Sequence, residues 1–220
     1  MWVKICANTC ADDALKAAEL GADAVGFVFA PSRRQVTAAQ VASIVRQLPS
    51  HIERIGVFSD HSPETIAGIA EGANLTAVQL HAGFDREFTR HLVGRLDPDI
   101  AIIQTVHWQV GSDPKQSAIR AILAEIANHA PGRVLVDAKV GDATGGTGVA
   151  FDWASAVPVL SSQPTLQIIL AGGLRPDNVA DAIRVLNPWG VDVASGVERE
   201  PGHKDFAKLK AFMQNARGVV

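Results

Sequence analysis

The chain alternates short apolar runs with helical patterns from one end to the other. The run at residues 24–30 is apolar almost throughout, which is typical of a parallel strand covered on both faces. We expect strands at residues 3–6, 24–30, 55–58, 75–80, 100–106, 133–137, 166–171 and 190–194. We expect helices at residues 12–20, 37–48, from 62 onward, and at 84–96, 112–129, 151–160, 177–186 and 205–216.

This alternation makes eight strand–helix units of roughly 25–30 residues each, the size found in (β/α)8 barrels. No proline- or serine-rich linker separates the units, so we predict a single α/β barrel domain spanning residues 1–220. The main alternative is a doubly wound dinucleotide-binding sheet, which needs a Gly-x-Gly-x-x-Gly turn after its first strand. Residues 6–12 contain no glycine, which argues against that alternative.

Charge and composition exclude several classes of partner. The net charge of −3 and the pI of about 6.1 argue against nucleic-acid binding, which requires a basic surface. No uninterrupted apolar stretch is long enough to predict a membrane span, and Lys4 interrupts the run that a signal peptide would need. The 2 cysteines do not form a disulfide framework, so we predict a reducing, cytoplasmic location.

The first predicted strand ends on a thiol. Because side chains alternate along a strand, Lys4 and Cys6 share one face while Val3 and Ile5 share the other. Catalytic groups of (β/α)8 barrels lie at the carboxyl ends of strands, so Cys6 is either a catalytic residue or core filler. A zinc site normally needs four ligands. We therefore interpret Cys10 as incidental and predict no metal site.

Small residues follow both of the last two strands. Gly172 and Gly173 come after the seventh strand, and Ser195 and Gly196 come after the eighth. Backbone amides exposed in such turns bind anions, and these two loops often form a phosphate site in barrels. We predict a phosphorylated small-molecule ligand. The alternative is that the glycines only shape tight turns.

Two aspartates lie near the carboxyl ends of predicted strands, on the faces expected to point into the barrel. Asp137 shares the face of Leu135, so it is either a general acid with a raised pKa or a satisfied buried carboxylate. Asp192 shares the face of Ala194 and is expected to anchor a polar network. A glycine-rich loop at 145–148 follows Asp137 and could cover a site or bind phosphate.

Two further side chains are candidates for ligand contacts. Arg34 follows the second strand, where its guanidinium could hold a carboxylate or stack on a ring, or could simply be solvated. His81 follows the fourth strand and is expected at the barrel mouth, although a lone histidine is more often structural.

Several motifs together resemble the phosphoribosylanthranilate isomerase family over nearly the whole chain. They lie at residues 3–6, 22–29, 78–81, 145–148, 151–153, 171–179, 191–198 and 201–205. The resemblance implies a cytoplasmic, monomeric or homodimeric enzyme of tryptophan biosynthesis that uses no metal or organic cofactor. It implies an Amadori rearrangement of N-(5-phosphoribosyl)anthranilate to 1-(o-carboxyphenylamino)-1-deoxyribulose 5-phosphate.

The resemblance also implies roles for the candidate residues. Asp137 would be the general acid and Cys6 the general base, with the thiol pKa lowered by nearby positive charge. Arg34 would orient the anthranilate group, and the turns after strands seven and eight would hold the phosphate. The residues implied in substrate contact are Arg34, Gln79, His81 and Asp192, with Gly172, Gly173, Ser195 and Gly196 at the phosphate.

The loop after Cys6 departs from the family pattern. Family members usually have glycine where this chain has Ala7, and alanine adopts positive φ less freely, so we expect this loop to differ. Two alternatives to the isomerase remain. One is another sugar-phosphate isomerase or epimerase, and the other is a non-catalytic barrel that binds sugar phosphates. The epimerases need a set of metal-binding histidines and aspartates that we do not find, and the related isomerases of histidine biosynthesis carry aspartate in place of Cys6.

Overall fold

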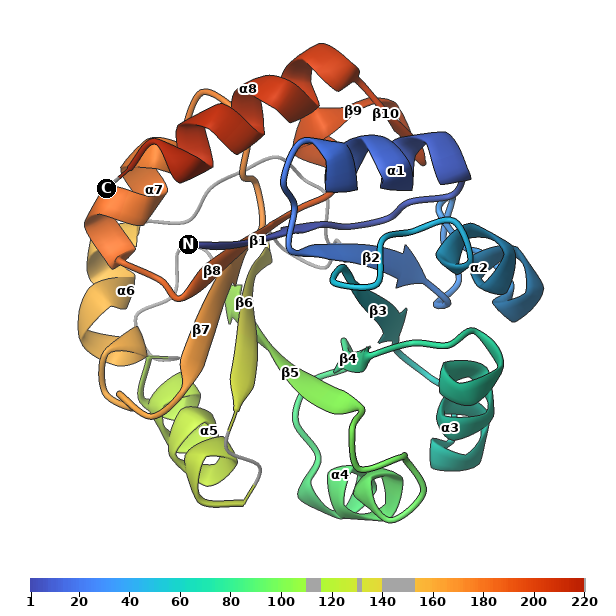
Figure 1. Ribbon diagram of the computed structural model, residues 1–220. Coiled ribbons are helices and arrows are strands. Elements are labelled where there is room, and N and C mark those ends of the chain that lie inside the picture. The colour runs from blue at the N-terminus through green and yellow to red at the C-terminus, as the bar shows by residue number, and fades with distance from the viewer. Residues whose placement is uncertain (110–115, 130–131, 140–152, 220) are drawn as a thin grey trace.

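The computed structural model describes residues 1–109, 116–129, 132–139 and 153–219 (Figure 1). Eight strands close into a barrel in chain order, and every neighbouring pair is parallel. The strands are β1 (Trp2–Ile5), β2 (Ala24–Val28), β3 (Glu53–Phe58), β4 (Ala77–Leu80), β5 (Ala101–Gln109), β6 (Arg133–Lys139), β7 (Gln167–Ala171) and β8 (Gly190–Val193). The predicted (β/α)8 fold is therefore confirmed.

The helices form a ring around this barrel (Figure 1). They are α1 (Ala11–Glu19), α2 (Ala38–Val45), α3 (Pro63–Gly72), α4 (Arg86–Val93), α5 (Gln116–His129), α6 (Trp153–Leu160), α7 (Val179–Leu186) and α8 (Phe206–Arg217). None of the helices in the described ranges has the length and apolarity that crossing a membrane requires. Residues 112–115 and 151–152, which were predicted as helix starts, lie outside the described residues.

Helices α2, α4 and α7 are shorter than predicted, and α7 begins at Val179 rather than at residue 177. Helix α2 was expected to reach residue 48 but ends at Val45, because the chain then tightens and the amide of Leu48 donates to the carbonyl of Val45 at 3.1 Å. Helix α4 was expected from residue 84 but begins at Arg86, where the carboxylate of Asp85 accepts a hydrogen bond from the amide of Phe88 at 2.9 Å. Capping side chains decide such boundaries.

Strand alternation separates an inner and an outer core, as predicted. Val3 and Ile5 of β1 face the helices, whereas Lys4 lies inside the barrel and is fully buried. The inner layer is small and consists of Ala24, Ile55, Ala77, Ile103, Leu135, Ile169 and Ala171. Because these side chains fill only the middle of the barrel, the strand ends beyond them can carry polar groups.

Aromatic and charged side chains close the amino-terminal end of the barrel. The rings of Trp2 and Trp189 stack with centroids 5.1 Å apart, and the guanidinium of Arg133 lies 5.4 Å and 5.0 Å from their centroids. Glu53 forms an ion pair with Arg133 and accepts a hydrogen bond from the Trp2 indole at 2.9 Å. This end is packed for stability, which leaves the carboxyl-terminal end for a ligand.

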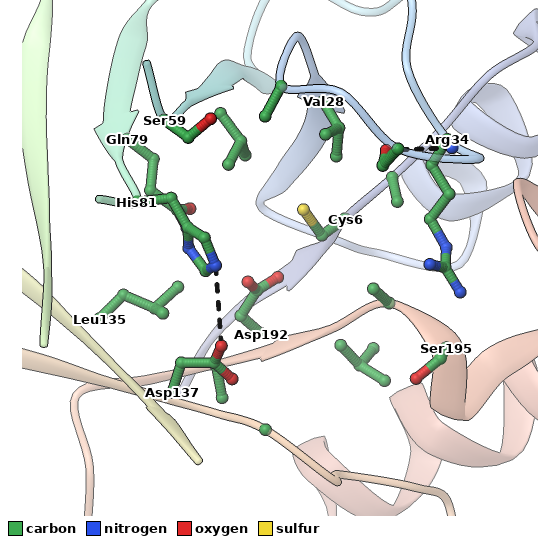
Figure 2. Close-up of a pocket in the computed structure, with 18 of the residues that line it drawn as sticks. Cys6, Val28, Arg34, Ser59, Gln79, His81, Leu135, Asp137, Asp192 and Ser195 are labelled. Carbon is green, nitrogen blue, oxygen red and sulfur yellow. Dashed lines mark hydrogen bonds and ion pairs between the residues drawn. The ribbon is translucent and has the colours of Figure 1, made fainter. Parts of the chain in front are cut away.

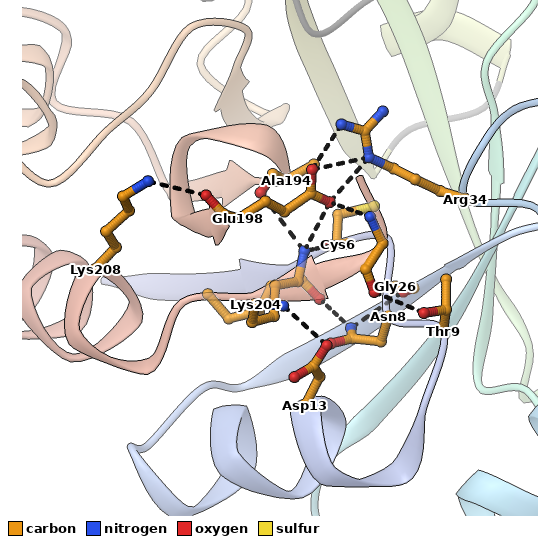
Figure 3. A network of polar contacts seen from close by, with 12 residues as sticks. Cys6, Asn8, Thr9, Asp13, Gly26, Arg34, Ala194, Glu198, Lys204 and Lys208 are labelled. Atoms are coloured by element: carbon orange, nitrogen blue, oxygen red, sulfur yellow. Dashed lines mark hydrogen bonds and ion pairs between the residues drawn. The ribbon is translucent and has the colours of Figure 1, made fainter. Parts of the chain in front are cut away.

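A small hairpin after β8 was not predicted. The 3-10 helix η2 (Ser195–Val197) leads into β9 (Glu198–Glu200), which pairs antiparallel with β10 (His203–Lys204) before α8 begins. Strands of three and two residues are too short to show a period in the sequence. The hairpin brings the side chains of Glu198 and Lys204 back towards the end of β1 (Figure 3).

Candidate active site

A cavity of about 500 Å³ opens at the carboxyl ends of the strands (Figure 2). Every residue that the sequence singled out for the site lines it: Cys6, Arg34, Gln79, His81, Asp137, Gly172, Gly173, Asp192, Ser195 and Gly196. Of the two adjacent arginines, Arg34 lines the cavity and Arg33 is exposed outside it. The glycine-rich loop at 145–148 lies outside the described residues.

Cys6 stands directly after β1 with its backbone fixed. Its amide donates to the carbonyl of Val193 at 2.8 Å, and the residue is 7% exposed. Gly26 on β2 makes room for the thiol, since a Cβ at that position would lie 2.7 Å from Cys6 Sγ. Burial raises the pKa of the Cys6 thiol, and the nearby charges of Lys4 and Lys204 only partly oppose this effect. The expected lowering of the thiol pKa is therefore not found.

A buried ion pair lies beneath the cavity. Lys4 Nζ donates to Gln79 Oε1 at 2.5 Å and to Asp192 Oδ2 at 3.1 Å. Burial alone would lower the pKa of Lys4, but the negative charges of Asp192 and Cys6 outweigh it and raise the pKa. Among the residues that the structure describes, none donates a hydrogen bond to Asp192 Oδ1. Because a buried polar atom normally has a partner, this oxygen is positioned to accept one from a ligand.

Asp137 ends the inner face of β6 next to His81. Burial, together with the charge of Asp192, raises the pKa of Asp137 to about 6, although Lys4 acts in the opposite direction. Burial, His107 and Lys4 lower the pKa of His81 to about 4, so this imidazole is neutral near pH 7. The 3.8 Å contact between His81 Nε2 and Asp137 Oδ2 is therefore not an ion pair at that pH. A carboxyl group with a raised pKa is suited to general acid chemistry.

A network from the unpredicted hairpin holds Arg34 and the loop of Cys6 (Figure 3). The carboxylate of Glu198 accepts from Arg34 Nη2 at 2.6 Å and from Nε at 2.9 Å. Burial would raise the pKa of Glu198, but Arg34 and Lys204 outweigh it and hold the pKa below its ordinary value. Lys204 Nζ also donates to the Cys6 carbonyl at 2.5 Å. One hairpin therefore fixes two residues of the cavity.

The turns after β7 and β8 require glycine for two different reasons. Gly172 and Gly173 have φ values of 82° and 67°, a region that favours glycine. Gly196 has no room for a side chain, because a Cβ there would lie 1.9 Å from the Leu174 carbonyl oxygen. Together with Ser195 these residues line one side of the cavity, where their backbone groups are available to an anion.

Comparison with known proteins agrees with this geometry. A family model described as N-(5'phosphoribosyl)anthranilate (PRA) isomerase matches residues 3–215. The N-(5'-phosphoribosyl)anthranilate isomerase of Thermotoga petrophila is 40% identical over 218 residues, which cover 99% of this chain and 98% of that protein. The chain belongs to the phosphoribosylanthranilate isomerase family. This membership confirms the predicted isomerase class and the assignment to tryptophan biosynthesis.

Solved phosphoribosylanthranilate isomerases share the fold of this chain. The Thermotoga maritima enzyme is 36% identical, covers 99% of each chain and superposes with a TM-score of 0.84. That enzyme is dimeric. A complex of a family member with reduced 1-(o-carboxyphenylamino)-1-deoxyribulose 5-phosphate is 35% identical, covers 99% of each chain and has a TM-score of 0.81. Family members therefore include a dimer and a complex with a phosphorylated small molecule.

The loop after Cys6 accommodates an alanine at a position where the backbone favours glycine. Ala7 adopts a φ of 63°, the left-handed conformation that the sequence suggested alanine would resist. The following residue holds it there: the buried Asn8 side chain donates to the carbonyls of Ile5 at 2.8 Å and Gly26 at 3.2 Å. The loop thus keeps a conformation suited to glycine at the cost of strain at Ala7.

We expect the substitution Ala7→Gly to stabilise the protein by roughly 0.5–1 kcal/mol. Relief of left-handed strain is worth about 1–2 kcal/mol, and the greater freedom of glycine in the unfolded chain offsets part of it. Urea unfolding of the variant beside the parent measures the difference. Ala14→Gly in α1, a buried alanine within a helix, is the matched control and should destabilise instead. A loss of stability in Ala7→Gly would contradict the strain argument.

Sequence reasoning missed three residues that organise the site. Lys4 was assigned only to the face of Cys6, but it is the buried partner of Asp192. Glu198 and Lys204 were recognised only as parts of motifs, and nothing in the sequence showed that they contact Arg34 and Cys6. A lysine inside an otherwise apolar strand was the one signal available, because a charge there needs a buried partner.

Proposed function

We propose that this protein catalyses the Amadori rearrangement of N-(5-phosphoribosyl)anthranilate, with Asp137 as general acid and Cys6 as general base. The observation that carries the proposal is the position of two ionisable groups from β6 and β1 on one cavity beside a glycine-lined turn. Figure 2 shows the thiol and the carboxylate both directed into this space. Their separation around the barrel suits a reaction that adds a proton at one atom and removes one at another.

The chemistry follows from the two groups. Asp137 in its acid form protonates the furanose ring oxygen, and the bond between C1′ and that oxygen breaks to give a Schiff base. The Cys6 thiolate then removes the C2′ proton, and the electron pair moves to form an enolamine. Tautomerisation of the enolamine gives the ketone. C1′ is reduced and C2′ is oxidised within one molecule, so the sequence of steps balances without an external oxidant or reductant.

The surrounding residues are placed to orient such a substrate. The turns holding Gly173 and Gly196 receive the phosphate, and Arg34 lines the same cavity. Glu198 accepts hydrogen bonds from Nε and Nη2 of Arg34. The planar face of the Arg34 guanidinium is then left for the anthranilate ring or carboxylate. Asp192, whose Oδ1 accepts no hydrogen bond from the described part of the chain, is a candidate to bind a sugar hydroxyl. We propose contacts from Gln79 and His81 as well.

The partner and location predictions remain proposals of the same kind. A phosphorylated small molecule is the proposed ligand, in line with the bound compound of the related structure. A cytoplasmic location, a monomeric or homodimeric state and the lack of nucleic-acid binding stay predictions. Gel filtration of the purified protein measures the oligomeric state directly.

The experiment that tests the function is a fluorescence assay on substrate formed in situ from anthranilate and phosphoribosyl pyrophosphate. We expect the anthranilate-type fluorescence of the substrate to decay with stoichiometric formation of the deoxyribulose product. Binding of the reduced product analogue without any turnover would favour the non-catalytic sugar-phosphate barrel. Turnover of pentulose phosphates with none of the anthranilate compound would favour an epimerase or another sugar-phosphate isomerase.

A further inference from the structure

A second group of potential ligands lies outside the cavity, where α1 begins beside the β9–β10 hairpin. It consists of Cys10, Asp13 and His203, each offering one ligand atom, and these atoms all lie within 4.8 Å of one another. Cys10 and Asp13 are three residues apart at the start of α1, so their side chains are neighbours. None of the three lines the large cavity, and the proposed chemistry uses none of them.

We propose that Cys10, Asp13 and His203 form a site for a divalent transition metal of the Zn²⁺ class. A thiolate, an imidazole and a carboxylate are the donor types that zinc combines in proteins, with water completing the tetrahedron. Calcium and magnesium prefer oxygen ligands, so a site containing thiolate and imidazole selects against them. The sequence analysis interpreted Cys10 as incidental because it found too few ligands for a zinc site. His203 is distant along the chain, and the β9–β10 hairpin brings it close to Cys10.

The geometry is close to what a bound ion requires. Tetrahedral bonds of the usual lengths place neighbouring ligand atoms roughly 3.4–3.6 Å apart. Ligand atoms that already lie within 4.8 Å of one another reach this spacing by small side-chain rotations. A cysteine binds a metal ion as the thiolate, so Cys10 must lose its thiol proton. On binding, the ion takes the place of that proton, which leaves to solvent.

The surroundings hold one ligand in place and leave the others accessible. Asp13 is buried, and its Oδ2 accepts a hydrogen bond from the Lys204 amide at 2.9 Å. Cys10 and His203 are partly exposed, so an ion can reach them from solvent. A bound ion would tie the start of α1 to the hairpin that holds Arg34 and the Cys6 loop (Figure 3). We therefore expect binding to stabilise the fold.

The test uses the purified, chelator-treated full-length protein and Co²⁺ as a spectroscopic substitute for Zn²⁺. We expect one equivalent of Co²⁺ to produce the near-ultraviolet thiolate-to-cobalt charge-transfer band and tetrahedral visible bands, both displaced by Zn²⁺. Cys10→Ser should abolish the charge-transfer band, and His203→Gln should weaken affinity at least about tenfold. With Zn²⁺ at a hundredfold excess over Kd, the Tm of the parent should rise by roughly 5–10 °C.

Two controls separate this site from the cavity. Cys6→Ser removes the other thiol and should leave the charge-transfer band intact. His81, His107 and Asp137 form another possible ligand group in the cavity, but it contains no thiol, so His107→Gln should also leave the band intact. The proposal is overturned if the parent binds no stoichiometric Co²⁺ at micromolar concentrations, or if the charge-transfer band persists in a Cys10→Ser protein that circular dichroism shows to be folded.

Discussion

The substitution Asp137→Asn is expected to lower kcat/KM for the isomerisation by about 10²–10⁴-fold, the usual contribution of a general acid. Asparagine keeps the size and polarity of the side chain but cannot deliver a proton to the ring oxygen. The measurement is the fluorescence assay under pseudo-first-order conditions. Retention of near-parent activity would show that Asp137 is not the acid, even if the reaction assignment is right.

The pH dependence sharpens this expectation. The reaction needs Asp137 protonated and Cys6 ionised, yet the pKa of Asp137 is about 6, while burial raises the pKa of Cys6 above its ordinary value. Only a minor fraction of the molecules therefore holds the active combination at neutral pH. Below pH 6 activity should rise with pH, between the two pKa values it should stay level, and above the pKa of Cys6 it should fall.

Asp137→Asn should change the shape of this profile as well as its height. Without the carboxyl group, only ionisation of Cys6 controls the residual rate, which should rise about tenfold per pH unit from pH 6 up to the pKa of Cys6. The activity of the parent stays level over that range, so the ratio of the variant rate to the parent rate isolates the effect of losing the Asp137 carboxyl group. The ratio also cancels the ionisation of the substrate phosphate, which occurs near pH 6. A ratio that does not vary with pH would contradict the assignment.

Stability provides the control for this variant. Between pH 3.8 and pH 6 the folded state retains a proton on Asp137 that the unfolded chain has lost, so the carboxyl group reduces stability as pH rises through this window. Its removal should stabilise the protein by up to about 3 kcal/mol above pH 6, and the gain should disappear near pH 4. An inactive but more stable variant cannot owe its loss of activity to unfolding.

The barrel could be predicted from the sequence because its pattern is repeated along the chain. The strand β2 is apolar on both faces, and the helix α2 that follows it opens with a capping box at Thr37. Repetition of this strand–helix pattern along the chain supports one architecture. The errors were at the ends of helices and strands and in the β9–β10 hairpin. Those boundaries depend on single hydrogen bonds, such as the one from Phe88 to Asp85, which no periodicity records.

The sequence could predict that the site residues lie close together, because the carboxyl ends of all the parallel strands lie at the same end of a barrel. Alternation placed Asp137 and Asp192 inward, and the glycines marked where the backbone turns tightly. The sequence could not reveal which charged side chains form ion pairs. Lys4 and Asp192 come into contact only because β8 pairs with β1 when the barrel closes. For the same reason the burial of Cys6, which raises its pKa, could not be anticipated from its neighbours in the chain.

The substitution Cys6→Ser is expected to lower kcat by roughly 10³-fold or more, while KM stays within a few-fold of the parent. A thiolate is the competent base, and a serine hydroxyl ionises far less readily, so almost no base is present at any accessible pH. Cys10→Ser, assayed with a chelator, is the matched control for loss of a thiol outside the cavity. It should keep the activity of the parent, so that a decrease in both variants would indicate a general effect of thiol loss.

The same variant distinguishes a base from a core residue. If Cys6 only filled space, serine would reduce stability through its buried hydroxyl and leave kcat nearly unchanged. If Cys6 is the base, serine lowers kcat strongly. The reduced product analogue should still bind as tightly as before, because Arg34 and the turns at Gly173 and Gly196 are unaltered. The smaller oxygen also fits beside Gly26, where the sulfur already leaves no room for a methyl group. Cys6→Ser should therefore separate binding, which the carboxyl-terminal turns and Arg34 provide, from proton removal at C2′, which only the thiolate provides.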